Sequence, residues 1–297
     1  MTFAFESMTN NIQLPHFEKM LYDQGQLLNV YLDAFLLTGD AEMLGATYDI
    51  ANYLTTPALA APNGGFFSSE DADSYHQNGD KEKHEGAFYV WTRKEFDEVI
   101  GNERDAALAA KFYNIKKHGN VSPEHDAHDE LTNQNVLAIV SSPEALAKEF
   151  NLPKEEVVAI LKQVRKKLRA HRDQRPRPAL DDKIVVGWNG LAIGALARTS
   201  SALAGVDDEN ATKHRNAAIK AVAFIKAELF DAETGQLWRV YREGRGDAPA
   251  FADDYAFFIQ GLMDLYEATW DDQYLEFAEQ LQSKHIALDS PTSSITH

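Results

Sequence analysis

The chain has 297 residues and contains no cysteine. This absence excludes disulfides, thiolate nucleophiles and cysteine-based zinc sites, and it is typical of proteins from a reducing compartment. No apolar run reaches the length of about 18 residues that indicates a membrane-spanning helix. The opening segment Met1–Leu14 also lacks the basic and apolar regions of a secretion signal. The sequence therefore predicts a cytoplasmic protein without membrane association, or a mitochondrial one if a targeting segment has been lost.

Positive charge is scarce. Lysine and arginine number 29 against 46 aspartate and glutamate residues, so the formal net charge is −17. An excess of this size repels phosphate backbones, and we expect no nucleic-acid partner. A neutral ligand such as a sugar or glycan meets no such repulsion. The apolar share of 44% is ordinary for globular proteins, so the chain can bury a sizeable core.

Helical periodicity dominates the sequence. Apolar residues recur at spacings of three and four in several segments, which predicts amphipathic or buried helices. The segments are Phe17–Leu37, Ala41–Leu54, Glu155–His171, Trp188–Leu203, Glu209–Phe230, Tyr255–Thr269 and Gln273–His285. Short turns join the members of three pairs, so we expect three αα-hairpins.

Two of these hairpins repeat in sequence. When the first hairpin is laid over the last so that Asp33 falls on Asp264, Thr38 also falls on Thr269. Repeated helical hairpins of roughly 60 residues suggest a ring or solenoid. The alternative is convergence, because antiparallel helices also arrive at such patterns by chance.

Between the first hairpin and Pro153 the sequence changes character. Pro62–Phe67 and Ala87–Trp91 are typical of short strands or extended segments. Two polar stretches, Asp71–Glu85 and His118–Asn135, are typical of loops. Long loops inside a helical scaffold commonly cover one end of it, where binding sites lie.

Four acidic and aromatic motifs lie at the starts of long apolar helices or at the edges of loops between helices. They are Pro15-His16-Phe17-Glu18-Lys19, Glu70-Asp71-Ala72-Asp73-Ser74, Asp181-Asp182-Lys183 with Trp188-Asn189-Gly190, and Phe251-Ala252-Asp253-Asp254-Tyr255. If the inner helices run parallel around a barrel, their N-terminal ends meet at one rim and these side chains converge. Carboxylates accept hydrogen bonds from hydroxyls, and aromatic faces stack on sugar rings, so the pattern suits a polyhydroxylated ligand.

Each motif also has a structural interpretation, which stays open beside the functional one. Asp253 and Asp254 open a helix, where one carboxylate can cap free N–H groups while the other faces a ligand. Asp181 and Asp182, followed by Lys183, fit a solvated turn with a local ion pair. Trp188 fits a core position as well as a ligand platform, and His16 fits a cap or a surface position.

Metal and nucleotide sites find little support. With Asp71 as the first position of a calcium-binding loop, Tyr75 and His76 stand where that loop needs a ligand and a glycine. No histidine pair has the spacing of a helical metal site, and no glycine-rich phosphate motif occurs. We therefore expect neither a metal nor a cofactor.

Four blocks of sequence carry a family resemblance. The blocks are PHFEKMLYDQGQL (Pro15–Leu27), GGFFSSEDADS with EGAFYVWT (Gly64–Thr92), RPRPALDDKI with WNGL (Arg175–Leu191) and FADDYAFFIQGLMDLYEAT (Phe251–Thr269). In these blocks the sequence resembles the spermatogenesis-associated thioredoxin-like proteins. The resemblance implies an all-α fold, the (α/α)6 toroid of six-hairpin glycosidases, similar to N-acylglucosamine 2-epimerase barrels, with short β insertions near residues 64–92.

The sequence departs from that family in what it lacks. The thioredoxin-like domain and its CxxC motif are absent, and three to four of the six hairpins are recognisable. An incomplete ring exposes apolar helix faces, so we expect self-association through this seam. The expected organisation is a divergent segment over residues 1–14, one partial barrel domain over residues 15–287 and a disordered tail over residues 288–297.

The resemblance implies carbohydrate processing of the epimerase or isomerase type. His16 is then the candidate general base or acid, because its reference pKa suits proton transfer near neutral pH. A glycosidase would instead need two carboxylates, for which Asp182 and Asp254 are the candidates. The expected substrate-binding residues are Glu18, Glu70, Asp73, Arg177, Trp188, Asn189, Asp253 and Tyr255. The alternative is a non-catalytic helical scaffold, or an inactive fragment, that binds a glycan or a protein.

Overall fold

The computed structural model describes residues 14–126 and 130–289, and these residues are mainly helical. They fall into two compact units. Unit 1 contains Lys19–Glu70 and the chain from Leu180 onward. Unit 2 contains Asp71–Ala179 together with the segment that ends at Glu18. The mainly helical fold with short β insertions, expected from the sequence, is confirmed.

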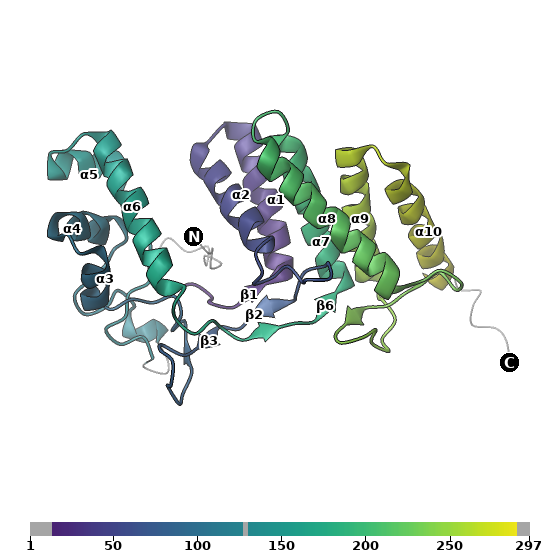
Figure 1. Cartoon of the computed structure of the whole chain (residues 1–297), viewed down its shortest axis with the longest axis horizontal. Coiled ribbons are helices and arrows are strands. Elements are labelled where there is room, and N and C mark those ends of the chain that lie inside the picture. Colours follow the sequence, from purple (N-terminus) through teal and green to yellow (C-terminus); the bar gives the residue numbers. More distant parts are fainter. Residues whose placement is uncertain (1–13, 127–129, 290–297) are drawn as a thin grey trace. The chain divides into compact units, whose positions relative to one another are not determined.

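Unit 1 is built from three αα-hairpins (Figure 1). The pairs are α1 (Leu21–Thr38) with α2 (Ala41–Leu54), α7 (Val186–Leu203) with α8 (Asp208–Glu228), and α9 (Ala252–Thr269) with α10 (Asp272–Asp289). The turn between α1 and α2 shows why the chain reverses there. Gly39 adopts a left-handed conformation with φ 69° at the end of α1, and the Asp40 side chain then accepts a hydrogen bond from the Glu42 N–H to cap α2.

Helices α1 and α7 pack side by side and run in the same direction. Gly25 lies against the backbone of Leu191, so close that a Cβ at position 25 would be 2.9 Å from the Leu191 carbonyl carbon. Further along both helices, Arg198 donates to Asn29 at 2.7 Å and to Asp33 at 2.5 Å. The residue numbers in contact rise together along both helices, which is the pattern of parallel helices.

Helix α9 packs on α7 in the same parallel sense. The Gly187 N–H donates to Asp254, and a Cβ on Gly190 would lie 2.4 Å from the Phe257 carbonyl oxygen. Glycine at position 190 therefore lets the two backbones approach more closely than any side chain would allow. Helix α7 thus lies between α1 and α9, and these three form the inner helices of unit 1.

The repeat predicted from the sequence has a structural counterpart. The alignment that places Asp33 on Asp264 also places the first residue of α1, Leu21, on the first residue of α9, Ala252. It likewise brings the start of α2 onto the start of α10. The two inner helices also share their length, because α1 and α9 each contain 18 residues. Equivalent positions of α1 and α9 therefore lie at equivalent heights on the two sides of α7.

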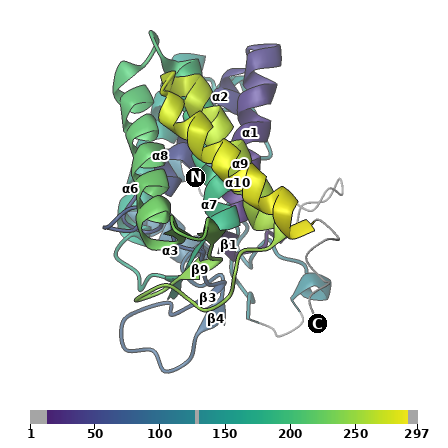
Figure 2. The ribbon, with the colours of Figure 1, turned by 90° about the vertical axis from the view of Figure 1, so that its right-hand side faces the viewer.

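Short strands precede the inner helices. β1 (Lys19–Met20), β2 (Ser69–Glu70) and β5 (Leu180–Asp181) form an antiparallel sheet in the order β1-β2-β5, and β6 (Ile184–Val185) pairs with β9 (Val240–Tyr241). A second strand pair joins β7 (Phe230–Asp231) to β8 (Gln236–Leu237). β1 leads directly into α1 and β6 into α7. In both views these strands lie at the lower ends of the helices (Figures 1 and 2).

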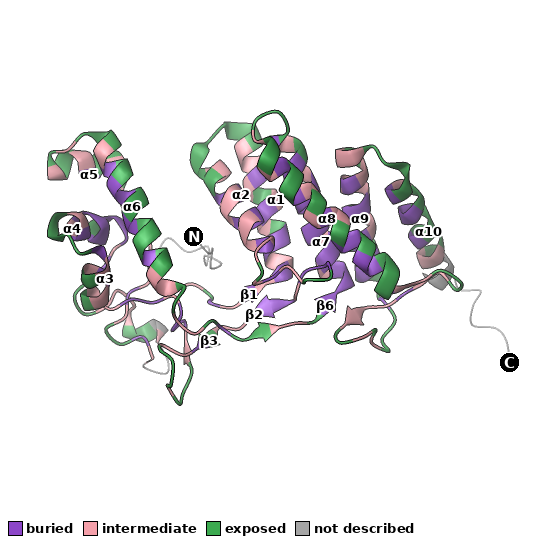
Figure 3. Ribbon diagram, viewed as in Figure 1, coloured by how far each residue is buried: buried purple, intermediate pink, exposed green. Residues whose placement is uncertain are grey.

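One hydrophobic core holds the hairpins of unit 1 together. Leu28, Ile193, Ala218, Phe258 and Leu281 are among its fully buried members, one from each of five helices. Figure 3 shows the buried residues on the sides that the helices turn toward one another. Because six of the 13 buried residues of α7 are alanine or glycine, its neighbours pack close to its backbone.

Unit 2 has its own smaller core. Its elements are β3 (Asp73–Ser74), β4 (His84–Glu85), α3 (Arg93–Ile100), α4 (Glu103–Phe112), the 3₁₀ turn Pro123–His125, α5 (Pro143–Phe150) and α6 (Lys154–Arg172). The apolar side of α6 packs on Trp91, Phe96 and Leu146 through residues such as Val157 and Leu168. The long helix predicted over Glu155–His171 is confirmed, whereas the sequence reading missed the three short helices.

The segment Ala87–Trp91 differs from the extended conformation expected for it. It forms a turn, with a single bridge from Trp91 to Asn135. The cause is Arg175, whose buried guanidinium donates to the carbonyl oxygens of Ala87, Phe88 and Val90 at 3.3, 2.9 and 2.8 Å. Carbonyls that converge on one cation cannot alternate sides as they do in a strand.

Two other expectations concern the ends of the chain and the membrane. The predicted domain limits at residues 15 and 287 stay a prediction, and most of the two terminal segments lies outside the described residues. Within residues 14–126 and 130–289, no helix combines the length and the apolar character needed to cross a bilayer.

Candidate functional site

The first turns of the three inner helices meet at one place, which we call the rim. The rings of Tyr22 in α1 and Trp188 in α7 contact edge to face, with centroids 4.9 Å apart. The Gly187 N–H of α7 donates to the Asp254 carboxylate of α9 at 3.3 Å. These contacts join the N-terminal ends of all three helices, as the parallel arrangement predicted from the motifs requires.

Asp254 is the buried carboxylate of the rim. Its side chain accepts hydrogen bonds from Arg239 at 2.9 Å and from the Phe251 N–H at 3.0 Å, in addition to the Gly187 N–H. Burial raises its pKa, while the backbone donors and Arg239 oppose that rise. The capping interpretation therefore holds for Asp254, since its carboxylate satisfies the start of α9 and ties α9 to α7.

Asp253 and Asp182 are the accessible carboxylates near Asp254. Asp253 is exposed and lies 3.9 Å from Arg239, and Asp182 pairs with Arg242 at 2.6 Å. Arg239 and Arg242 stand directly before and after strand β9, so the short segment around β9 binds Asp253, Asp254 and Asp182 through two guanidinium groups. The local ion pair expected in the Asp181-Asp182-Lys183 turn also exists and joins Asp181 to Lys183 at 2.9 Å.

The two predicted aromatic platforms differ in exposure. Trp188 is half-buried, so part of its ring is available at the rim. Tyr255 is 1% exposed; its hydroxyl accepts from the Leu237 N–H at 3.1 Å and its ring stacks on His285. Trp188 thus combines core packing with an open edge, whereas Tyr255 is enclosed in the core.

Asn189 and Glu70 are also buried. The Asn189 amide accepts from the Phe66 N–H at 2.7 Å and donates to the Phe66 and Val185 carbonyls, so its hydrogen-bonding groups are all engaged. Glu70 is 1% exposed and accepts from the Tyr53 hydroxyl at 2.5 Å.

Lys19 lies directly opposite Glu70 in the β1–β2 pair and is 2% exposed. Directly opposed residues share one face of a strand pair, so a buried cation and a buried anion stand side by side there. The predicted site residues include Glu70 but neither Lys19, although it stands in one of the four motifs, nor Tyr53. A buried lysine is rare unless it is paired, and the sequence alone cannot show burial at such a position.

The four remaining predicted residues belong to unit 2. His16 is exposed, and its Nδ1 accepts from the N–H of half-buried Glu18 at 3.2 Å. Asp73 is exposed at the start of the β3–β4 hairpin. Arg177 is exposed and its guanidinium lies 5.5 Å from the centroid of the Phe88 ring.

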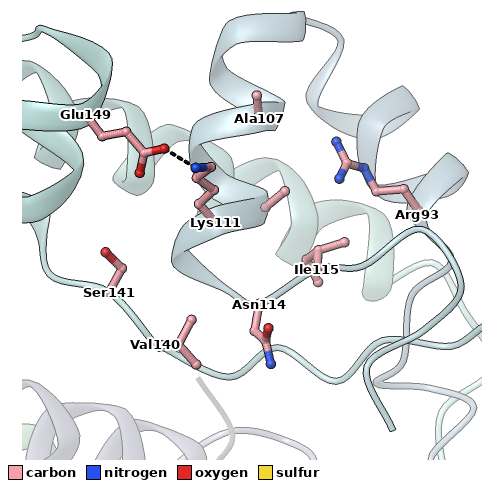
Figure 4. A pocket seen from close by; sticks show the side chains of 9 residues that line it. Arg93, Ala107, Lys111, Asn114, Ile115, Val140, Ser141 and Glu149 are labelled. Atoms are coloured by element: carbon pink, nitrogen blue, oxygen red, sulfur yellow. Dashed lines mark hydrogen bonds and ion pairs between the residues drawn. The ribbon is translucent and has the colours of Figure 1, made fainter.

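Unit 2 also contains a surface cavity of about 570 Å³. Figure 4 shows that it lies between α4 and the segment around Ser141, with the Lys111–Glu149 ion pair at one side. Lys111 and Glu149 satisfy each other's charge, and Ala107 and Ile115 supply an apolar wall. No residue predicted from the sequence lines this cavity. Among the described residues, no group of three or more histidine, aspartate or glutamate side chains is placed to hold a metal ion.

Comparisons with known proteins give close relatives over most of the chain. Human spermatogenesis-associated protein 20 is 38% identical over 285 residues, which cover 91% of this chain and 35% of that protein. The Caenorhabditis elegans uncharacterized protein B0495.5 is 35% identical over 291 residues, covering 93% of this chain and 38% of that protein. The chain thus spans little more than a third of the curated relatives' length. No family model matches it.

The similarity to solved structures is more distant. A D-mannose isomerase is 15% identical with a TM-score of 0.28, and the likeness covers 95% of this chain and 78% of that chain. A sugar epimerase from a ruminal bacterium is 13% identical with a TM-score of 0.29, covering 95% of this chain and 79% of that chain.

Proposed function

We propose that the rim binds a sugar for a carbohydrate-processing barrel of the same kind as the part of human spermatogenesis-associated protein 20 to which this chain is 38% identical, 35% of that protein. The observation that carries this proposal is the meeting of three helix N-termini around Trp188. An aromatic edge, two accessible carboxylates and two arginines lie within the first turns of α1, α7 and α9 or beside them.

The chemistry of the rim favours a neutral polyhydroxylated ligand. Asp253 and Asp182 can accept hydroxyl hydrogen bonds, and Arg239 and Arg242 can donate them. The accessible part of half-buried Trp188 offers an apolar surface for the C–H side of a sugar ring. Each charge at the rim has a partner of opposite sign, so the site carries no large net charge that would demand an ionic ligand. We assign Asp254 the task of holding the rim together.

Separately from the rim, we propose that His16 of unit 2 is the base of an epimerisation or isomerisation and removes the proton next to a ring-opened carbonyl. The exposure of His16 supports this role, since a proton carrier must reach its substrate. Hydrolysis by Asp182 and Asp254 is the second candidate. In that case Asp254 would have to leave its three hydrogen bonds, which makes this the weaker proposal. Glu18, Glu70, Asp73, Arg177, Asn189 and Tyr255 remain proposed contributors to substrate binding, directly or by positioning.

Isothermal calorimetry with a panel of aldoses, N-acetyl-hexosamines and short glucans tests the binding. We expect Trp188→Ala to weaken binding of the best sugar by about tenfold, a loss of roughly 1.4 kcal/mol. The matched control is Trp270→Ala, because Trp270 is 77% exposed at the opposite end of α9. A panel in which no sugar binds the wild-type chain would refute the proposed function.

Solvent-deuterium incorporation at C2 of the bound sugar tests the catalytic step. We expect His16→Ala to abolish incorporation and His118→Ala, at another exposed histidine, to leave it unchanged. Retained exchange in the His16 variant removes His16 from the mechanism. A sugar that binds without exchange or hydrolysis favours the alternative, a non-catalytic scaffold.

We also propose self-association through the exposed apolar side of α1. Val30 and Leu37 lie two turns apart on one side of that helix and are 61% and 87% exposed. Sedimentation velocity should show a dimer that Leu37→Glu dissociates. A wild-type chain that stays monomeric at a protein concentration of about 100 micromolar would contradict this, because a dimer with a dissociation constant below that concentration would be populated there.

A further inference from the structure

A second polar cluster lies deeper along the inner helices than the rim, and none of its members was singled out from the motifs. We call it the arginine layer; its members are Asn29 and Asp33 of α1, Arg198 of α7, and Gln260 and Asp264 of α9. Arg198 is ten residues beyond Trp188 on the same helix. At a rise of 1.5 Å per residue, the layer lies about 15 Å further along the helix axis than the rim tryptophan.

The arginine layer follows the internal repeat. The alignment that relates α1 to α9 places Asn29 on Gln260 and Asp33 on Asp264. Each inner helix beside α7 therefore carries an amide and a carboxylate four residues apart, on one side of the helix. The α1 pair accepts from Arg198 at 2.7 and 2.5 Å, and Gln260 donates to Asp264 at 3.1 Å.

The structure makes room for the α9 pair. A Cβ on Gly194 would lie 2.5 Å from an Asp264 carboxylate oxygen, so glycine at that position lets the Asp264 side chain lie directly against α7. Burial raises the pKa of Asp264, and the charge of Arg198 opposes the rise. Asp33 and Arg198 nevertheless keep 51% and 35% of their side-chain surface exposed, and Gln260 is exposed. The layer is thus open to a ligand, unlike the enclosed Asn189.

We propose that the arginine layer is a second sugar subsite, and that the ligand of the rim is therefore an oligosaccharide. The layer offers two amides, two carboxylates and one guanidinium, of which the α1 pair binds the guanidinium of Arg198 and the α9 pair binds itself, so it presents both donors and acceptors to hydroxyl groups. A separation of about 15 Å exceeds the length of one sugar ring, so a ligand that reaches both places contains several linked rings. Phe257 lies one turn before Gln260 on α9 and is 39% exposed, which provides an aromatic surface between the rim and the layer.

This inference rests on the proposed function, and one experiment separates the two. Calorimetry compares glucose with maltotriose and cellotriose on the wild-type chain and on Asp33→Asn, Gln260→Ala and Trp188→Ala. The control is Glu276→Gln, an exposed acidic position on the outer helix α10. We expect one trisaccharide to bind wild type about tenfold more tightly than glucose. Asp33→Asn and Gln260→Ala should remove that advantage without changing glucose affinity, whereas Trp188→Ala should weaken both ligands.

Three results would overturn the inference. A trisaccharide advantage that survives in both layer variants shows that the layer does not touch the ligand, while the rim proposal stands. If the layer variants lower the urea midpoint but leave the ratio of trisaccharide to glucose affinity unchanged, the layer is an ion-pair network that only stabilises the fold. A wild-type chain that binds none of the three sugars removes the subsite together with the proposed function.

Discussion

Buried His214 makes the stability of unit 1 sensitive to mild acid. The side chain is 0% exposed in α8, and neither ring nitrogen has a hydrogen-bond partner among the described residues. Burial and the charge of Lys213 lower its pKa from 6.5 to about 4, while Asp207 acts in the opposite direction. The folded chain therefore holds this imidazole neutral at pH values where the unfolded chain protonates it.

The sign and size of the effect follow from the two pKa values. The folded pKa is the lower one, so stability is complete above pH 6.5 and is lost as the pH falls toward 4. Between pH 7.5 and pH 5 the loss from this one group is about 2 kcal/mol. Carboxylates with lowered pKa values, such as Asp207, lose their contribution only at lower pH. The comparison of wild type with a His214 variant isolates this one group, because other groups with shifted pKa values, such as His76, Asp254 and Asp264, are common to both chains.

Urea unfolding at pH 7.5 and pH 5 measures this loss. We expect the wild-type midpoint to fall by roughly 1 M, because about 2 kcal/mol divided by a typical urea slope gives that shift. His214→Leu should keep its midpoint to within a few tenths of a molar, since it removes both the titration and two unsatisfied nitrogens. His118→Leu, at an exposed histidine, should follow wild type. A His214→Leu chain that loses as much stability as wild type would refute the reasoning.

Three further substitutions probe the packing described above, each by urea unfolding. Gly190→Ala should destabilise the fold by about 3 kcal/mol, because the added methyl group collides with the backbone of α9. Its control, Gly45→Ala, has open space around the new methyl group and should stabilise the fold by about 1 kcal/mol. Equal effects of the two substitutions would contradict the close approach of α7 and α9. Arg175→Met should cost about 3 kcal/mol by freeing three carbonyls and a carboxylate, whereas Arg177→Met at the exposed neighbour should be near neutral. Asn189→Ala should lower the free energy of unfolding by about 3 kcal/mol, since it leaves a buried N–H and two carbonyls without hydrogen-bond partners. A loss below about 1 kcal/mol would mean that water replaces the amide.

The sequence predicts the helices of unit 1 well because their signals are local. Gly39 and Asp40 mark the turn between α1 and α2, and apolar spacing marks the faces that pack. Each of the long predicted helices begins or ends within a few residues of its structural limit. The offset between the repeated hairpins was also readable, since Asp33 and Asp264 stand at the same helical position.

The site is harder to read because burial is not local. Tyr255 looks like a sugar platform beside two acidic residues, yet α9 turns it into the core. Asp254 and Asn189 look like ligand groups, and both are used by the backbone of neighbouring segments. Conversely, Arg198 sits in an apolar helix where it looks like an interruption, and only the packing of α1 shows its partners.

The division of unit 1 along the chain bears on how it is synthesised. α1 and α2 end at Leu54, and the helix they must pack against begins at Val186, after the whole of unit 2 has been made. At ordinary translation rates this gap takes on the order of ten seconds. The apolar sides of the first hairpin lack their packing partner for that time, so chaperones can bind them. Unit 2 consists mainly of the contiguous segment Asp71–Ala179, so it can fold during this time. Its folding shortens the flexible chain between α2 and α7, which lowers the entropy cost of bringing these helices together.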